Sequence, residues 1–473
     1  MNGRRMRLVV MTALVMLLAV SGVAGARDDG VSSLPEFRGP FPDTENMVFH
    51  GQVTPTDMGA LPIELFGIAK GFASDIEQWT SPAGEQYALV THSGGIGFIR
   101  VTDPDDVQFV GTIPAFIPDP VFNVTHLWGD PDTWGTYGYF TREGFGDPFT
   151  TDLIIVDLSG LDALEPAAPG TDISSHLPTA LVRPGGYEGA HNIEIDSEGY
   201  AYLPGTHLEH GAANNACGVE EPAEFNMLIL DVKSDPMNPS VAACIPNTAE
   251  HDVFVVNDYD GPDSDYQGRD IAFIFDGFSG MTFIWDVTDK ANISVIAEFS
   301  LASEGLVFSH NGVPTEDLTH LFIGDELDEL FDSLLTGNKK PEIGTYIVDI
   351  HDLDSPVFDE RYTDGSVGID HNFVVKGDRL YVASYNSGTR VFDIVDEGNG
   401  SITLSPIAHM DTEPRLPNKI FNLNQELKFV SNFLGQWGID VFDDGTIIVS
   451  DLNNGVVVMS LSDEPCRGMK CSK

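Results

Sequence analysis

A short strand unit recurs along the chain and limits the folds that it can adopt. It is clearest at Gly368–Ile394, where runs of β-branched and aromatic residues are separated by Gly, Asn and Asp. The runs Asp370–Val375, Arg379–Ser384 and Thr389–Ile394 predict strands, and the breaks between them predict tight turns. A lone three-stranded meander cannot bury both of its faces, so recurring units are expected to stack around an axis.

Similar units recur with a period of roughly 60 residues, which lies in the range of blade-like repeats. Their third strand carries a signature of two apolar residues followed by Asp. Copies of this signature are Ile155-Val156-Asp157, Ile229-Leu230-Asp231, Ile284-Trp285-Asp286, Ile347-Val348-Asp349 and Val391-Phe392-Asp393. Helical periodicity is almost absent, and Asp325–Leu335 is the one short helix candidate.

Repeated four-stranded antiparallel units without a helical layer predict an all-β fold, a single β-propeller. We count seven units over residues 75–462. The seventh unit lacks an obvious fourth strand, and the lead-in segment, residues 27–74, could supply it and close the ring. A right-handed β-helix is the structural alternative, but its coils are much shorter than this period.

The first residues, 1–26, resemble a secretory signal peptide rather than part of the fold. Arg4, Arg5 and Arg7 precede the apolar run Leu8–Val20, and Ala24-Gly25-Ala26 offers small residues for cleavage. A membrane anchor is the alternative, although the apolar run is short for one. The tail, residues 463–473, is polar and carries no anchor signal. We therefore expect a secreted, extracellular protein without a membrane span after cleavage.

The formal net charge of −49 limits the classes of molecule that the protein can bind. Such a surface repels nucleic acid and anionic membranes, and it attracts divalent cations. Solubility in a saline medium explains the charge as well as any specific acidic surface does. The expected partner is an extracellular ligand or surface partner of unknown identity.

The cysteines are few and even in number. Cys217 and Cys244 bracket one unit, and Cys466 and Cys471 lie in the tail. Behind a signal peptide this pattern favours two disulfides, Cys217–Cys244 and Cys466–Cys471. The spacing does not resemble a zinc site. Glycosylation sequons begin at Asn123, Asn292 and Asn399.

Polar residues recur at the start of the first strand of several units. In a propeller this strand lines the central channel, so equivalent positions form a ring at one depth. The predicted ring consists of His191, Asn192, His251, Asp252, His310, Asn311, Asp370, His371, Asn372 and Trp437. Trp128 occupies a place comparable to that of Trp437, and Asp75 and Trp79 lie near the equivalent position of the first unit. Asp325 and Glu326 follow a second strand and could turn towards the channel, whereas Asp328 and Glu329 are expected in solvent.

Such a ring allows three interpretations. Imidazoles with carboxylates could hold a divalent transition metal or carry out acid–base chemistry. They could also be structural, each side chain forming hydrogen bonds to the neighbouring blade. The corresponding functions are a binding or cell-surface interaction module, a metal-dependent hydrolase or lactonase acting in the channel, and a structural matrix protein. The chain has no recognisable Ser–His–Asp order, nucleophile elbow or phosphate-binding loop, so an enzymatic activity is uncertain.

A second candidate site is an acidic loop after a predicted strand. Asp258, Asp260, Asp263 and Asp265 alternate along a Gly-containing segment, and calcium prefers many oxygen ligands. The spacing is not that of an EF-hand. A plain acidic turn, or one held by an ion pair with Arg269, is the alternative.

The repeats resemble the LVIVD-repeat proteins, and more closely the choice-of-anchor B family of secreted propellers. The matching stretches are Gly189–Ile193, His251-Asp252, Gly261–Asp263, Gly268-Arg269, Thr315–Asp317, Asp325–Glu329, Asp370–Asn372 and Gly435–Trp437. The resemblance implies a seven-bladed propeller in which Cys217 and Cys244 form a pair, and free secretion in the absence of a C-terminal anchor. The family has no established enzymatic activity that the resemblance could carry over to this chain. Where the family pattern has His-Gln-Gly-Trp, this chain has His310-Asn311-Gly312-Val313, which puts an aromatic contact there in doubt.

Overall fold

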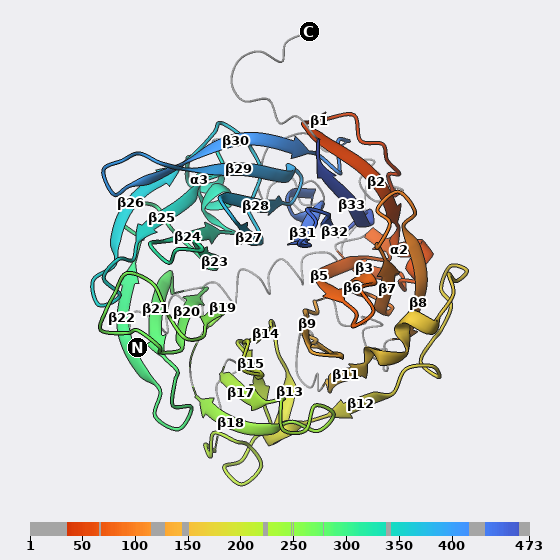
Figure 1. Cartoon of the computed structure of the whole chain (residues 1–473), viewed down its shortest axis with the longest axis horizontal. Coiled ribbons are helices and arrows are strands. Elements are labelled where there is room, and N and C mark those ends of the chain that lie inside the picture. The colour runs from red at the N-terminus through yellow and green to blue at the C-terminus, as the bar shows by residue number, and fades with distance from the viewer. Residues whose placement is uncertain are drawn as a thin grey trace.

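The structure is a computed structural model, and it confirms the β-propeller. It describes residues 36–462 except 66–67, 115–127, 144–150, 221–225, 247, 249, 278, 337–341 and 416–430. Seven antiparallel sheets, here called blades, stand around a central axis like the segments of a ring (Figure 1). The predicted signal peptide, the sequon at Asn123 and the predicted Cys466–Cys471 pair lie outside the described residues.

Each of the first four blades is a four-stranded antiparallel sheet. The first contains β5 (Ala73–Thr80), β6 (Gln86–His92), β7 (Gly95–Arg100) and β8 (Gln108–Pro114). The second contains β9 (Pro131–Trp134), β10 (Tyr137–Phe140), β11 (Leu153–Asp157) and β12 (Thr179–Val182). The third contains β14 (Glu194–Ile195), β15 (Tyr200–Leu203), β17 (Met227–Asp231) and β18 (Ser240–Ile245). The fourth contains β19 (Asp252–Val256), β20 (Ile271–Asp276), β21 (Met281–Asp286) and β22 (Ser294–Ser300).

The last three blades follow the same order. The fifth contains β23 (Ser309–Pro314), β24 (His320–Asp325), β25 (Thr345–Asp349) and β26 (Val357–Tyr362). The sixth contains β27 (Phe373–Lys376), β28 (Arg379–Ser384), β29 (Gly388–Asp396) and β30 (Ile402–Met410), with β1 (Thr44–Glu45) beyond β30. The seventh contains β31 (Gln436–Val441), β32 (Ile447–Asp451) and β33 (Gly455–Leu461), followed by β2 (Met47–Val53).

The N-terminal segment closes the ring. β2 pairs antiparallel with β33, with Met47 opposite Leu461 and Val53 opposite Val456, so the outer strand of the seventh blade comes from the beginning of the fold. β1 pairs with β30 of the sixth blade in the same way. One short segment therefore ties two neighbouring blades, and no blade of the ring is left with three strands.

The remaining elements are short. They are the strand pairs β3 (Ile63–Leu65) with β4 (Ile68–Lys70) and β13 (Tyr187–Gly189) with β16 (His207–Leu208), the helices α2 (Pro55–Met58) and α3 (Asp328–Thr336), and the 3-10 turns η2 (Leu158–Ala163), η3 (Pro184–Gly186) and η4 (Ser431–Phe433). The helix expected near Asp325–Leu335 is α3. Among the described residues, no helix has the length and apolar character needed to cross a membrane.

The Asp of the third-strand signature stabilises the turn that follows it. The carboxylate of Asp157 accepts a hydrogen bond from the Ser159 amide at 3.0 Å. Asp286 accepts one from the amide of Thr288 at 3.1 Å. Asp349 does the same for the next amide but one. Since a short carboxylate can mimic a backbone turn in this way, the signature recurs for a local structural reason.

The core lies between the blades, so the middle strands are buried on both faces and read as apolar runs. Phe273 and Phe275 of the fourth blade pack in one cluster with Leu321 and Ile323 of the fifth. Gly312 of β23 makes this approach possible, because a Cβ there would lie 2.4 Å from the Phe275 ring. The Gly of the His-Asn-Gly-Val stretch is thus required by packing between blades.

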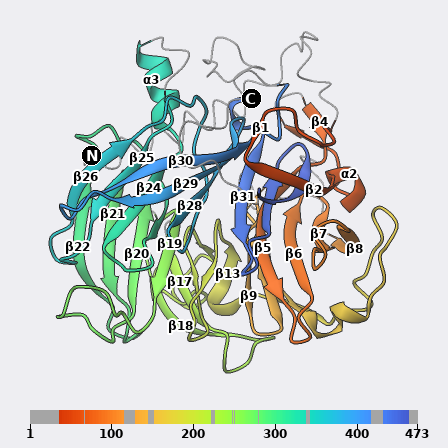
Figure 2. The same cartoon turned by 45° about the horizontal axis from the view of Figure 1, so that its top comes forward.

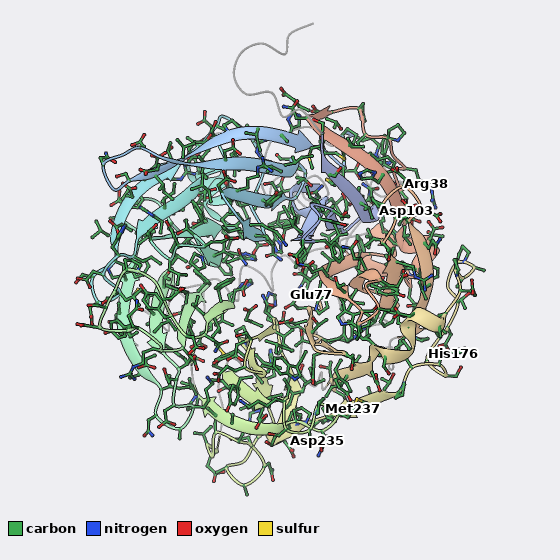
Figure 3. The ribbon with its side chains drawn as sticks, viewed as in Figure 1. Arg38, Glu77, Asp103, His176, Asp235 and Met237 are labelled. Carbon is green, nitrogen blue, oxygen red and sulfur yellow. A yellow bond between two sulfur atoms is a disulfide. The ribbon has the colours of Figure 1, made fainter. Side chains whose placement is uncertain are left out.

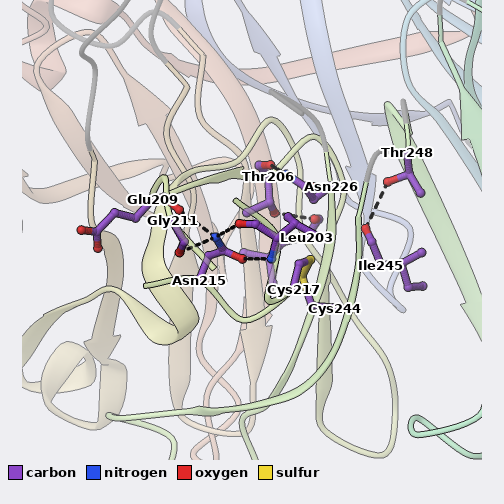
Figure 4. Close-up of a disulfide and its surroundings, with 11 residues drawn as sticks. Leu203, Thr206, Glu209, Gly211, Asn215, Cys217, Asn226, Cys244, Ile245 and Thr248 are labelled. Carbon is purple, nitrogen blue, oxygen red and sulfur yellow. Dashed lines mark hydrogen bonds between the residues drawn. A yellow bond between two sulfur atoms is a disulfide. The ribbon is translucent and has the colours of Figure 1, made fainter. Parts of the chain in front are cut away.

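The third blade carries the Cys217–Cys244 disulfide, which confirms that predicted pair (Figure 4). The Asn215 side chain organises the same loop, since its amide donates to the carbonyls of Glu209, Gly211 and Val219. The disulfide joins this loop to the outer strand β18, so it fastens a long connection to the blade.

Candidate functional site

The predicted histidines meet on the propeller axis, one from each of four consecutive blades. The ring centroids are 4.2 Å apart between His191 and His251, 4.3 Å between His251 and His310, and 4.4 Å between His310 and His371. The indole of Trp437 continues the series at 4.2 Å from His371. Trp128 stacks on Trp437 at 4.4 Å. We call these six side chains the aromatic ring of the site.

Asp75 enters this ring from the first blade. It has room because Gly438, next to Trp437, has no side chain, and a Cβ there would lie 2.0 Å from the Asp75 carboxylate. The space enclosed beneath the aromatic ring is about 10 Å³, lined by Asp75, Asp130, Asn192 and Asn372 as well as the ring itself. That volume holds about one water molecule. The channel is therefore closed at this depth by side chains.

Hydrogen bonds fix the tautomers of two ring histidines. Nδ1 of His251 donates to the carbonyl of His310 at 3.1 Å, and Nδ1 of His371 donates to the carbonyl of Trp437 at 2.6 Å. A carbonyl only accepts, so Nδ1 carries the proton and Nε2 presents a lone pair. Burial lowers the pKa of His251 and His310 well below the usual value and that of His371 to about 3. These imidazoles are neutral near pH 7.

His191 differs from the other three histidines. Its Nδ1 lies 2.5 Å from the carboxylate of Glu143, which follows β10. Burial lowers the pKa of His191, but the Glu143 carboxylate outweighs it and the net shift is upward. The pKa of Glu143 falls for the converse reason, because its attraction to His191 outweighs its own burial. The two form an ion pair inside the channel mouth.

The Asn and Asp residues that follow the histidines form hydrogen bonds between different blades. The Asn311 amide donates to the Asp252 carboxylate at 2.9 Å, and the Asn372 amide donates to Asp75 at 2.8 Å. The Asn311 carbonyl also accepts from the backbone amide of Phe373 in the next blade. The structural interpretation therefore describes these residues well, because their polar atoms are used within the fold.

A deeper tier of carboxylates lies below and was not predicted from the sequence. It consists of Glu77, Asp132, Glu194 and Asp440, and Glu77 lies at the central opening in Figure 3. Burial raises the pKa of all four, to about 7 for Asp132. Each lies two positions after a residue at the level of the aromatic ring. These residues are Asp75, Asp130, Asn192 and Gly438. Since alternate residues of a strand share one face, this spacing was the available signal.

Some predicted residues lie away from the aromatic ring. Asp325 accepts from the amides of Val307, Phe308, Leu327 and Asp328 and so organises the start of α3. Asp370 is buried, with both carboxylate oxygens without hydrogen-bond partners, and does not line the enclosed space. Trp79 donates to the Gly135 carbonyl and packs between the first two blades. Glu326 does reach the ring, with Oε2 3.7 Å from Nε2 of His310.

The prediction that Asp328 and Glu329 are solvated was wrong. Asp328 is 8% exposed and Glu329 is 1% exposed. Asp328 pairs with Arg361 at 2.9 Å, and Glu329 lies beside the Asp328 carboxylate. Burial and the Asp328 carboxylate raise the pKa of Glu329 well above its usual value. Both acids lie at the start of α3 and point into the fold instead of outward.

The four acids proposed for calcium do not gather around one point in the described structure. Asp263 instead lies with Asp352 and Asp354 of the fifth blade, their closest oxygens within 4.8 Å of one another. Asp263 also accepts from the Leu353 amide at 2.9 Å, and Arg269 pairs with Asp286 rather than with the loop. The loop thus contacts the next blade, and the calcium site remains a prediction.

The comparisons with known proteins show only distant structural similarity. No family model matches the chain, and no curated protein matches it. The WD40 β-propeller domain of Doa1 is 12% identical, with a TM-score of 0.46 over 90% of this chain and 98% of that one. A functionally unknown protein from Desulfotomaculum acetoxidans is 11% identical, with a TM-score of 0.46 over 84% of this chain and 95% of the other. YCF48 bound to D1 peptide is 9% identical, with a TM-score of 0.43 over 91% and 99%. At these levels of similarity, the assignment to a seven-bladed β-propeller rests on the strand pairing itself.

Proposed function

We propose that this protein is a secreted binding module that contacts an extracellular ligand or surface partner through the face carrying the aromatic ring. The observation that carries the proposal is the convergence of His191, His251, His310, His371, Trp128 and Trp437 on one mouth of the channel. Aromatic side chains on a concave polar surface favour recognition of another molecule.

The positions of the long connections also favour this face as the binding surface. First strands begin and second strands end at the aromatic ring, so the segments 204–226, 326–344 and 411–435 connect strands there. Figure 2 shows α3 and β4 on this side. Most connections at the opposite face are short, such as 135–136 and 377–378, with 158–178 and the acidic loop, 257–270, as exceptions. Binding residues concentrate on long loops held by a rigid scaffold.

The proposal also includes secretion of the protein and its membership of a propeller family. The basic and apolar start of the chain supports secretion, and the repeat motifs support membership of the choice-of-anchor B propellers. The charge of −49 supports a partner that is not nucleic acid.

Site-specific photo-crosslinking tests the binding face. A benzophenone side chain replaces Glu304, in the connection from β22 to the ring, or Asp443, in the turn after β31 on the opposite face; both positions are exposed. The protein is then incubated with cells and extracellular extract of its source. We expect one crosslinked species from Glu304 and none from Asp443. Crosslinks from Asp443 alone, or self-association at both positions, would contradict the proposal, and the latter result would favour a matrix protein.

A metal-dependent hydrolase acting in the channel is the second candidate, favoured by the closeness of His251, His310 and Glu326. The small space beneath the ring limits such chemistry to the outer side of the mouth. A panel of lactones and esters tests it, with the His251→Ala/His371→Ala double variant as the comparison. Turnover that this variant abolishes while retaining its fold would establish the enzyme.

A further inference from the structure

The aromatic ring contains a group of side chains suited to hold one transition-metal ion. His251, His310 and Glu326 each offer one ligand atom, and these atoms all lie within 4.8 Å of one another. One pair is closer still, since Nε2 of His310 lies 3.7 Å from Oε2 of Glu326. A tetrahedral ion with bonds of about 2.0–2.2 Å holds its ligand atoms about 3.3–3.5 Å apart. The remaining gap is within reach of side-chain rotation.

The supporting hydrogen bonds present the correct atoms. Because Nδ1 of His251 donates to the carbonyl of His310, its Nε2 is free to coordinate. Tyr385 donates its hydroxyl hydrogen bond to Oε1 of Glu326 at 2.6 Å, which leaves Oε2 facing His310. Metal-binding imidazoles and carboxylates are usually oriented by partners of this kind on their other atom.

Burial and access also fit a bound ion. His310 is 2% exposed, so an ion held by it is largely shielded from water. The Glu326 side chain keeps 16% of its surface exposed, so an ion has a route from solvent on the ring face. Among the described residues, no Lys or Arg forms an ion pair with Glu326 within 4.0 Å.

We propose that His251, His310 and Glu326 bind a divalent first-row transition ion such as Zn²⁺ at the channel mouth. Imidazole with one carboxylate suits this class of ion better than calcium, which prefers oxygen ligands alone. His191 is outside the set, because it does not belong to the group whose ligand atoms all lie within 4.8 Å of one another. The inference goes beyond the proposed function, because metal binding does not require that a partner docks.

Calorimetric titration with ZnCl₂ after chelation, in excess Mg²⁺ to occupy surface carboxylates, tests the site. We expect one saturable equivalent per chain for the wild type. Glu326→Gln and His310→Asn are expected to weaken binding at least tenfold, whereas His176→Asn, at an exposed position of the outer rim, binds as the wild type does. No saturable equivalent, or wild-type affinity in folded Glu326→Gln and His310→Asn, would overturn the proposal.

A second measurement needs no variant to fold. The wild type loaded with Co²⁺ is expected to show the intense visible absorption of a four-coordinate site, and one equivalent of Zn²⁺ is expected to remove it. Weak absorption typical of octahedral oxygen ligands would assign the ion to surface carboxylates and overturn the proposal. Neither measurement depends on a partner, so a failed crosslinking experiment and a failed metal titration remain distinguishable.

Discussion

Replacing Glu77 by Gln should stabilise the protein at neutral pH. Asp440 accepts hydrogen bonds from the amides of Gln78 and Val441 and from the Gln78 side chain, at 3.0, 2.7 and 3.2 Å, which suits an ionised carboxylate. Burial and the Asp440 and Asp132 carboxylates raise the pKa of Glu77 well above 4.5. Glu77 therefore keeps its proton in the folded state and donates it to Asp440, as the Gln amide would at any pH.

The sign and size of the effect follow from proton linkage. Above pH 4.5 the unfolded chain releases the Glu77 proton, while the folded chain holds it. Stability therefore falls as pH rises, by about 1.4 kcal/mol per pH unit for one proton. Between pH 5.5 and 7.5 the wild type loses roughly 2–3 kcal/mol through this group, and Glu77→Gln does not. The variant should thus gain that amount relative to the wild type over this interval.

Urea unfolding followed by tryptophan fluorescence at pH 5.5, 6.5 and 7.5, in the presence of chelator, measures the difference. Glu298→Gln is the control, because Glu298 is an exposed residue of β22 far from the channel. The reasoning is refuted if Glu77→Gln unfolds at lower urea than the wild type at pH 7.5 and keeps the full wild-type pH dependence.

Three further predictions test other parts of the fold. Glu329→Gln should raise the free energy of unfolding at pH 8 by about 1–3 kcal/mol, because folded Glu329 keeps its proton while the unfolded chain releases it, a cost that the Gln variant lacks; a lower urea midpoint would contradict this. Gly312→Ala should cost about 1–3 kcal/mol, since the added methyl meets the Phe275 ring, and an unchanged melting temperature would show that the blades can separate. Replacing Cys217 and Cys244 by Ser opens a loop with a sequence separation of 27 and should cost about 3.5 kcal/mol by chain entropy; equal stability of both forms would argue against that constraint.

The aromatic ring could be predicted because it depends on the repeat alone. Equivalent positions of a closed propeller meet at one depth, so His191, His251, His310 and His371 were brought together by counting strands. The same reasoning placed Trp437 beside Trp128. Trp79 was expected near the ring but does not reach it. It lies four positions after Asp75, towards the other end of β5, where it packs between blades.

The parts that failed depend on loops, whose course the repeat does not determine. Asp325 is used by backbone amides of its own turn, and Glu329 is buried by the helix that follows. The calcium site was inferred from carboxylates that alternate along the acidic loop alone. In the structure, Asp263 instead faces a turn of the next blade. The deeper carboxylates have a signal in the sequence, their spacing of two residues from the strand starts, but they are not a repeated motif, since their residue types differ from blade to blade.

Anomalous X-ray diffraction at the zinc edge, from crystals soaked in ZnCl₂, locates a bound ion and the side chains around it in one experiment. Because ring closure brings distant blades together, we expect one dominant anomalous peak at the channel mouth, bonded to His251, His310 and Glu326. A map whose only peaks lie on surface acids such as Asp263, Asp352 and Asp354, or one in which the histidines do not meet, would contradict it.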